Sequence, residues 1–209
     1  MKNINIVAGG PFSSLPVLRL DSNEIWIAVD RGLEHLLRYD IEPDYVLGDF
    51  DSVSPKLMNK IRQQRFKQFP AQKDETDLEL AISYALKEKP DIINVFGATG
   101  GRLDHGLVNL QLLLRSIDRS TTVFMIDNKN KITLKKPGMY SINKSEYKYV
   151  SFLSFFEKIE GLTLQGFKYP LTLATLECGS SLCISNELIL DIGTYSFSSG
   201  ILIVVESCD

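Results

Sequence analysis

The strongest constraint on the fold is a regular alternation of short apolar runs with helical periods between residues 3 and 126. Short apolar runs are typical of buried strands, and apolar residues spaced three or four apart are typical of helices. The predicted strands are Asn3–Ala8, Glu24–Val29, Asp44–Leu47, Phe66–Phe69, Asp91–Phe96 and Thr121–Ile126. The predicted helices are Arg31–Tyr39, Ser54 to about Gln64, Glu75–Lys87 and Leu103–Ile117. Such alternation predicts an α/β unit, a mostly parallel sheet with helices on both faces.

The pattern changes near residues 128–137, and from Gly138 onward it contains no helical period. Apolar runs separated by Gly and Ser turns are typical of a small antiparallel β-sandwich. These runs are Tyr149–Phe155, Leu162–Phe167, Leu188–Ile192 and Gly200–Glu206. We therefore predict two domains, an α/β domain over residues 1–130 and a β-sandwich over residues 131–209.

Charge and cysteine content exclude several classes of protein. Lys and Arg number 23 against 26 Asp and Glu, so no basic excess favours a nucleic acid or a membrane surface as partner. The three cysteines, all in the C-terminal part, are too few for a disulfide scaffold. The sequence has neither a signal peptide pattern nor an apolar stretch of roughly 20 residues. We expect a soluble, cytoplasmic protein.

Acidic residues gather where predicted strands end. Asp49 and Asp51 are two residues apart, a spacing that points both side chains to one side of an extended backbone. Paired carboxylates of this kind suit Mg²⁺ held together with substrate phosphates. The same residues also fit a polar turn that leads into a helix capped by Ser54. Asp30 is a further strand-end acid, and it could equally cap the helix that follows it.

A second polar cluster runs from Lys73 to Asp77. Asp74 is a plausible helix N-cap with Asp77 at the third position, where a carboxylate interacts well with the helix dipole. The helix-cap interpretation explains less well why Lys73 and three acidic residues lie together at the end of a strand. Open α/β sheets place their ligands at this edge, so the cluster also suggests a binding site.

A third cluster, Gly97–His105, follows a predicted strand and opens a helix. Glycines let backbone N–H groups approach phosphates, the helix N-terminus favours anions, and Arg102 can donate two hydrogen bonds to phosphate oxygens. The segment matches neither the P-loop nor the dinucleotide fingerprint. His105 is either a structural residue at the helix start or a base.

Together these segments resemble the bacterial form of the thiamine pyrophosphokinase family, in motif, order and spacing. The matching motifs are Gly9-Gly10, Ala28–Asp30, Gly48–Ser52, Asp74–Asp77, Gly97–His105, Tyr169–Leu171 and Ser185–Glu187. The resemblance extends over nearly the whole chain. It implies a nucleotide-binding α/β domain, a thiamine-binding β-sandwich, and a homodimer with active sites between subunits.

The resemblance also implies an activity, the Mg²⁺-dependent reaction of thiamine with ATP to give thiamine diphosphate and AMP. The residues that look catalytic are Asp49, Asp51, Asp74 and Asp77, of which Asp49, Asp51 and Asp77 look like the Mg²⁺ site, with Asp74 beside it. Our own choice for the group that accepts the hydroxyl proton is Asp74. Those that look like ATP contacts are Lys73, Thr99, Arg102 and Asp104. Those that look like contacts to the acceptor substrate are Asp30, Ser185 and Asn186.

Two other functions remain open at this point. An enzyme with similar strand-end aspartates could transfer diphosphate to another hydroxymethyl heterocycle, such as a pterin alcohol. The two C-terminal motifs, Tyr169–Leu171 and Ser185–Glu187, favour thiamine. A thiamine or nucleotide sensor without catalysis would bind ligand and release no AMP, although the sequence keeps all the aspartates.

Overall fold

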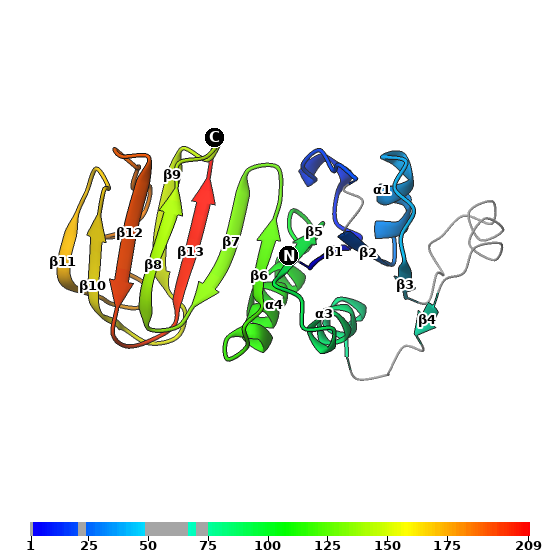
Figure 1. Cartoon of the computed structure of the whole chain (residues 1–209), viewed down its shortest axis with the longest axis horizontal. Helices are drawn as coiled ribbons and strands as arrows, with labels where there is room; N and C mark the ends of the chain where they lie inside the picture. Colours follow the sequence, from blue (N-terminus) through cyan, green and yellow to red (C-terminus); the bar gives the residue numbers. More distant parts are fainter. Residues whose placement is uncertain (1, 21–23, 49–66, 70–74) are drawn as a thin grey trace. The chain divides into compact units, whose positions relative to one another are not determined.

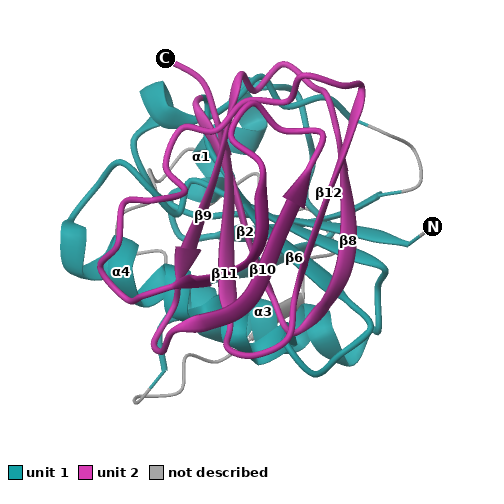
Figure 2. Cartoon of the chain, turned by 90° about the vertical axis from the view of Figure 1, so that its left-hand side faces the viewer, with its two compact units in different colours: residues 1–128 teal, residues 129–209 magenta. Residues whose placement is uncertain are grey.

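The structure is a computed structural model that describes residues 2–20, 24–48, 67–69 and 75–209 (Figure 1). The chain divides into two compact units, Met1–Asn128 and Lys129–Asp209, coloured teal and magenta in Figure 2. No helix in the described ranges is long and apolar enough to cross a bilayer.

The first unit contains a parallel sheet with the strand order β4-β3-β2-β1-β5-β6. Its strands are β1 (Asn3–Val7), β2 (Glu24–Val29), β3 (Tyr45–Leu47), β4 (Lys67–Phe69), β5 (Ile92–Phe96) and β6 (Thr122–Ile126). Successive strands are added on one side of β1 as far as β4 and on its other side from β5. The carboxyl ends of β1 and β5 therefore form a topological switch point, where open α/β sheets bind ligands.

The central strands are buried along most of their length, as a parallel sheet covered on both faces requires. Ile4, Ile6 and Val7 of β1 have no exposed surface. Asn5, also buried, accepts a hydrogen bond from Asn94 of β5 and donates one to Glu24 of β2, at 2.9 and 2.7 Å. Burial of apolar side chains therefore stabilises the sheet, and the hydrogen bonds of Asn5 link the side chains of β2, β1 and β5 inside it.

The helices of the first unit follow the predicted positions with different ends. They are α1 (Gly32–Arg38), α3 (Asp77–Lys87) and α4 (Leu103–Leu112), with 3-10 helices η1 (Phe12–Ser14) and η2 (Leu113–Ser116). The predicted helix over Leu103–Ile117 thus tightens into a 3-10 turn at Leu113. The helix predicted to begin at Ser54 lies outside the described residues.

Of the helix caps that the sequence suggested, the two at α1 and α3 are wrong, and the one at Ser54 lies outside the described residues. The side chain of Thr76 caps α3 by accepting a hydrogen bond from the Glu79 N–H at 3.2 Å, so Asp77 takes the first helical position and Asp74 is not the N-cap. At α1 the N-cap position belongs to Arg31, with no side-chain cap, rather than to Asp30. Gly32 begins α1, and a Cβ there would overlap the Val7 carbonyl oxygen. This close approach fixes the start of α1 against the end of β1.

The second unit is a sandwich of two antiparallel sheets, as predicted. One sheet contains β7 (Asn130–Lys135), β13 (Leu202–Ser207) and β9 (Tyr149–Ser154), in that order. The other has the order β11 (Leu171–Leu176), β10 (Ile159–Gln165), β12 (Ile192–Phe197) and β8 (Gly138–Asn143). The core includes Phe152 of β9 and Leu162 of β10, so both sheets contribute to it.

The predicted strand over Leu188–Ile192 is wrong, because this apolar run is not buried as a strand. Ile189 and Leu190 are more than half exposed, and the run makes an isolated bridge between Leu188 and Phe167. The strand β12 begins only at Ile192. The prediction also lacked β7, β8 and β11; the charged or Gly-containing sequences of β7 and β8 carry a weak apolar signal, whereas the alternating Leu and Thr residues of β11 were overlooked.

Candidate functional site

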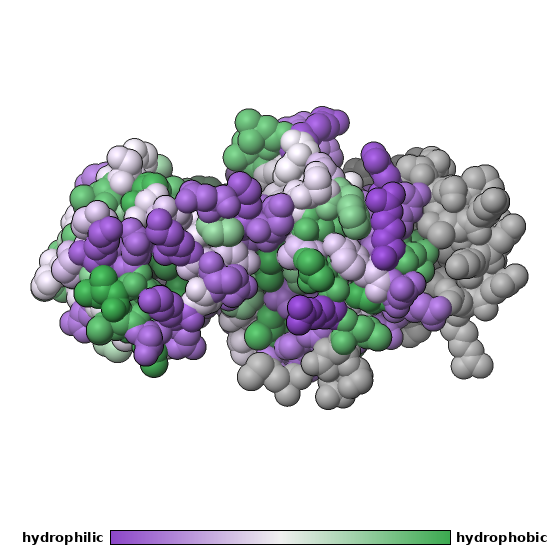
Figure 3. All heavy atoms as spheres, turned by 90° about the horizontal axis from the view of Figure 1, so that it is seen from above, coloured by the Kyte–Doolittle hydropathy of each residue, from purple (hydrophilic) through white to green (hydrophobic). Residues whose placement is uncertain are grey.

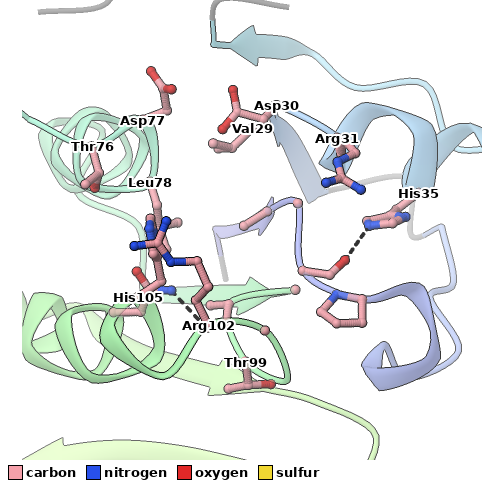
Figure 4. Close-up of a pocket in the computed structure, with 18 of the residues that line it drawn as sticks. Val29, Asp30, Arg31, His35, Thr76, Asp77, Leu78, Thr99, Arg102 and His105 are labelled. Atoms are coloured by element: carbon pink, nitrogen blue, oxygen red, sulfur yellow. Dashed lines mark hydrogen bonds between the residues drawn. The ribbon is translucent and has the colours of Figure 1, made fainter. Parts of the chain in front are cut away.

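A pocket in the first unit lies at the switch point of its sheet (Figure 4). Its walls come from the loops that follow β1, β2 and β5, from α1 and α4, and from the N-terminal turn of α3. Of the predicted site residues, Asp30, Asp77, Thr99 and Arg102 line this pocket. Asp49, Asp51, Lys73 and Asp74 lie outside the described residues.

The loops after β1 and β5 meet through their backbones. The N–H of Gly10 donates to the carbonyl oxygen of Gly97 at 2.9 Å. A Cβ at Gly10 would overlap that same oxygen, so only glycine allows this approach. The predicted glycine segments therefore lie side by side on the wall of the pocket.

Two side chains hold the loop between β5 and α4. The Thr99 hydroxyl donates to Asp127 at 2.8 Å, and the Asn109 amide donates to the Ala98 carbonyl oxygen at 2.8 Å. Asp127 is only 8% exposed and directly follows β6. Sequence reasoning missed Asp127, although its place after a strand is the signal that singled out the other acids. The Thr99 side chain is thereby oriented within the loop.

Arg102 and Asp104 form a bidentate ion pair at the start of α4. Arg102 Nε and Nη2 donate to the two carboxylate oxygens at 3.1 and 2.5 Å. Those hydrogen bonds lower the pKa of Asp104 to about 2. Arg102 lines the pocket, whereas Asp104 is not among its lining residues in the described part of the chain. In this arrangement Asp104 orients Arg102.

Asp30 and Asp77 place two carboxylates on the same side of the pocket (Figure 4). Asp30 has a φ of 49°, a left-handed conformation that Asp adopts more readily than most residues other than glycine. Its Oδ1 lies where a Cβ of Gly48 would be. Asp30 therefore lies against the glycine that directly precedes the Asp49–Asp51 motif in sequence.

The pocket also carries positive groups. Arg31, Arg38 and Arg102 belong to its lining, and Figure 3 shows strongly hydrophilic residues over and beside α1, the helix that Arg38 ends. Guanidinium groups favour phosphate, and carboxylates favour divalent cations. The lining thus combines the two kinds of group that a metal–triphosphate complex requires.

His35 is a pocket residue that sequence reasoning overlooked. It lies on α1, is 7% exposed, and has Nε2 2.8 Å from the carbonyl oxygen of Gly10. Burial lowers the pKa of its imidazole. A lone histidine in a helical period gives no signal that its partner lies in a glycine loop earlier in the chain.

In the second unit, Asn186 joins the two C-terminal motifs. Its Oδ1 accepts from the N–H groups of Tyr169 and Glu187 at 3.0 and 2.9 Å, and its Nδ2 donates to the Tyr169 carbonyl oxygen at 2.9 Å. Asn186 is 2% exposed, so these contacts give it a structural role. Its contact with substrate stays a prediction.

The neighbouring Ser185 is exposed and has a φ of 57°. Its N–H donates to the Ser151 hydroxyl at 2.9 Å, which fixes this left-handed residue in place. The Tyr169 ring is also exposed, and Lys168 Nζ lies 5.6 Å from its centre. An exposed hydroxyl and an exposed aromatic ring therefore flank the buried Asn186.

Two family models match the chain. Residues 18–125 match the catalytic domain of thiamin pyrophosphokinase, and residues 139–202 match its vitamin B1 binding domain. The thiamine pyrophosphokinase of Bacillus subtilis (strain 168) is 47% identical over 214 residues, covering the full length of both chains.

Solved structures give the same relationship. The crystal structure of thiamine pyrophosphokinase from Bacillus subtilis has a TM-score of 0.93 and 46% identity, covering 99% of each chain. That of thiamin pyrophosphokinase from Geobacillus thermodenitrificans has a TM-score of 0.92 and 43% identity, covering 99% of this chain and 98% of the other.

Proposed function

Since the chain belongs to the thiamine pyrophosphokinase family of enzymes, we propose that it transfers the pyrophosphoryl group of ATP to the hydroxyl of thiamine. The products are thiamine diphosphate and AMP. The observation that supports this reaction best is the pocket at the switch point, where Asp30 and Asp77 lie with Arg31 and Arg102. Phosphoryl transfer depends mainly on positioning and on neutralising phosphate charge, which these side chains can provide.

In this proposal the thiamine hydroxyl attacks the β-phosphorus of ATP, and AMP leaves. The glycine loops after β1 and β5 receive the phosphates, with Thr99, Arg102 and Lys73 as further contacts. Asp104 acts on ATP through the orientation of Arg102, its ion-pair partner. We assign the role of accepting the hydroxyl proton to Asp74, which by family resemblance lies beside the Mg²⁺ site.

We further propose that the reaction uses Mg²⁺. Its ligands by family resemblance are Asp49, Asp51 and Asp77. The donor chemistry fits, because Asp77 and Asp30 bring carboxylate oxygens to the pocket and Mg²⁺ prefers oxygen ligands. The ion neutralises charge on the phosphates when it is bound.

The first unit is thus proposed to bind ATP, and the second to bind thiamine through Ser185 and Asn186, with Asp30 near the transferred group. This division follows the two family models. The proposed location is the cytoplasm, where a thiol such as the exposed Cys178 stays reduced.

The reaction is tested by AMP release from ATP and Mg²⁺, with and without thiamine. We expect AMP only with thiamine, one for each thiamine diphosphate formed, and no turnover when EDTA removes the metal. Turnover with a pterin alcohol but not with thiamine would contradict the acceptor. Tight binding of ATP and thiamine without AMP release would show a sensor instead.

The homodimer is proposed from the exposed apolar face of α4. Leu103, Leu107 and Val108 are 76, 56 and 38% exposed, and Leu112 is the buried residue of this helix. Exposed apolar patches of this kind mark interaction sites, and the occupant that the family resemblance implies is a second copy of the chain.

Leu107→Glu is expected to weaken such a dimer at least about tenfold, because it places a charge in an apolar contact. Multi-angle light scattering then gives a mass closer to the 23.5 kDa of one chain. The matched control is Val17→Glu, at a site 74% exposed and outside α4. A wild-type mass of one chain at micromolar concentration would contradict the dimer.

A further inference from the structure

His35 connects α1 to the loop that follows β1. Gly32 fixes the start of α1 against β1, and His35 lies almost one turn later on the same helix. Its Nε2 lies 2.8 Å from the carbonyl oxygen of Gly10, and the ring lies beside Phe12, with 5.6 Å between ring centres. Figure 4 shows this hydrogen bond as a dashed line at the edge of the pocket.

The hydrogen-bond partner of His35 Nε2 determines which ring nitrogen carries the hydrogen. A carbonyl oxygen only accepts hydrogen bonds, so Nε2 carries the hydrogen. The other nitrogen, Nδ1, is buried, and among the described residues it has no hydrogen-bond partner. A charged ring would place a second N–H at this buried position without an acceptor. The site therefore favours a neutral imidazole that serves as a donor to Gly10.

The hydrogen bond from His35 to Gly10 is followed by a second one, from Gly10 to Gly97. Gly10 accepts from His35 through its carbonyl oxygen and donates through its N–H to Gly97 of the second glycine loop. A carbonyl oxygen without a donor would carry its partial negative charge beside the proposed triphosphate. Donation from Nε2 offsets that charge and fixes the direction of the peptide group.

We infer that His35 is a positioning residue for ATP, which holds the loop over residues 9–12 in the conformation that receives phosphates. This inference rests on the proposed function for the identity of the ligand. His35 transfers no proton in this role, and its effect is on nucleotide affinity rather than on the chemical step.

The test compares His35→Leu with His35→Gln. Leu fills similar space without a donor, whereas the amide of Gln can place a donor near the position of Nε2. We expect His35→Leu to raise the Kd and the KM for ATP about tenfold, because the Gly10 carbonyl loses its partner, with kcat within about threefold of wild type. His35→Gln is expected to bring both constants back to within about threefold.

Binding of ATP is measured by calorimetry without thiamine, and thermal unfolding checks that each variant is folded. If His35→Leu does not fold, His35→Asn replaces it, because its shorter side chain does not reach Gly10. Unchanged ATP affinity in the donor-free variant overturns the inference, and so does a Gln variant as weak as Leu. A fall in kcat with unchanged affinity also overturns it, since it would place His35 in the chemistry.

The two proposals fail in different ways. If the wild-type chain binds ATP but forms no thiamine diphosphate, the proposed reaction is wrong, and the binding constants of the variants still decide the role of His35. If the wild-type chain does not bind ATP, the inference about His35 is wrong as well.

Discussion

Asp77→Asn is expected to lower kcat at least about 100-fold while the protein stays folded. Asp77 begins α3 and lines the pocket on the same side as Asp30. The substitution keeps the shape of the side chain but removes the negative charge that the proposed Mg²⁺ requires. The cap of α3 is kept because Thr76 supplies it, so only the dipole interaction of about 0.3–1 kcal/mol is lost.

AMP release at saturating ATP, Mg²⁺ and thiamine measures this effect, with circular dichroism to check the fold. The control is Asp40→Asn, because Asp40 is exposed, lies outside the pocket lining and has a left-handed φ of 55° that Asn tolerates. It should turn over like the wild type. Near-normal turnover of Asp77→Asn would contradict a role of Asp77 in binding Mg²⁺ and leave it only the role of stabilising the start of α3.

Asn186→Ala is expected to lower the free energy of unfolding of the second unit by about 3 kcal/mol. Three hydrogen bonds to backbone groups of Tyr169 and Glu187 are lost, and they come from a side chain that is 2% exposed. The partly buried backbone groups of Tyr169 and Glu187, left without these partners, account for most of this cost.

The free energy of unfolding is measured by denaturant unfolding, with far-UV circular dichroism as the signal. The control, Asn143→Ala, alters an exposed amide of β8 and should stay within about 0.5 kcal/mol of the wild type. An unchanged unfolding free energy together with a higher KM for thiamine would show that Asn186 acts on the substrate and not on the fold.

The strands of the first unit could be predicted because central parallel strands are buried on both faces. β2 appears in the sequence as an apolar run from Ile25 to Val29, and β1 has apolar Ile4, Ile6 and Val7; the observed ends of both strands lie within one residue of the predicted ones. The cap of α3 could not be predicted, because Asp74 and Thr76 both favour this position. The choice depends on which residue takes the extended conformation, here Thr76 with φ −73° and ψ 153°.

The sandwich was harder to predict in detail. Its strands expose one face, so polar residues interrupt the apolar ones. The apolar runs by which a strand is recognised are therefore short, as in β8. A continuous apolar run such as Leu188–Leu190 misled the prediction, since Ile189 and Leu190 are exposed in the structure.

In the site, the positions of Asp30 and of the two glycine loops at the pocket could be predicted, because the carboxyl ends of parallel strands meet at one edge. The side chains that hold those loops could not. His35 and Gly10 are 25 residues apart, and Thr99 and Asp127 are 28 apart. Such pairs depend on the folded path of the chain, which local patterns do not contain.

The position of β1 between β2 and β5 has a consequence for biosynthesis. Asn5 and Asn94, which pair across β1 and β5, are separated by 89 residues. A nascent chain can pair β1 with β2 early, but closing the long loop to β5 carries an entropic cost and waits for translation to reach it. Until then β1 has an open edge that other chains can pair with, and the nucleotide pocket lacks one of its two glycine loops.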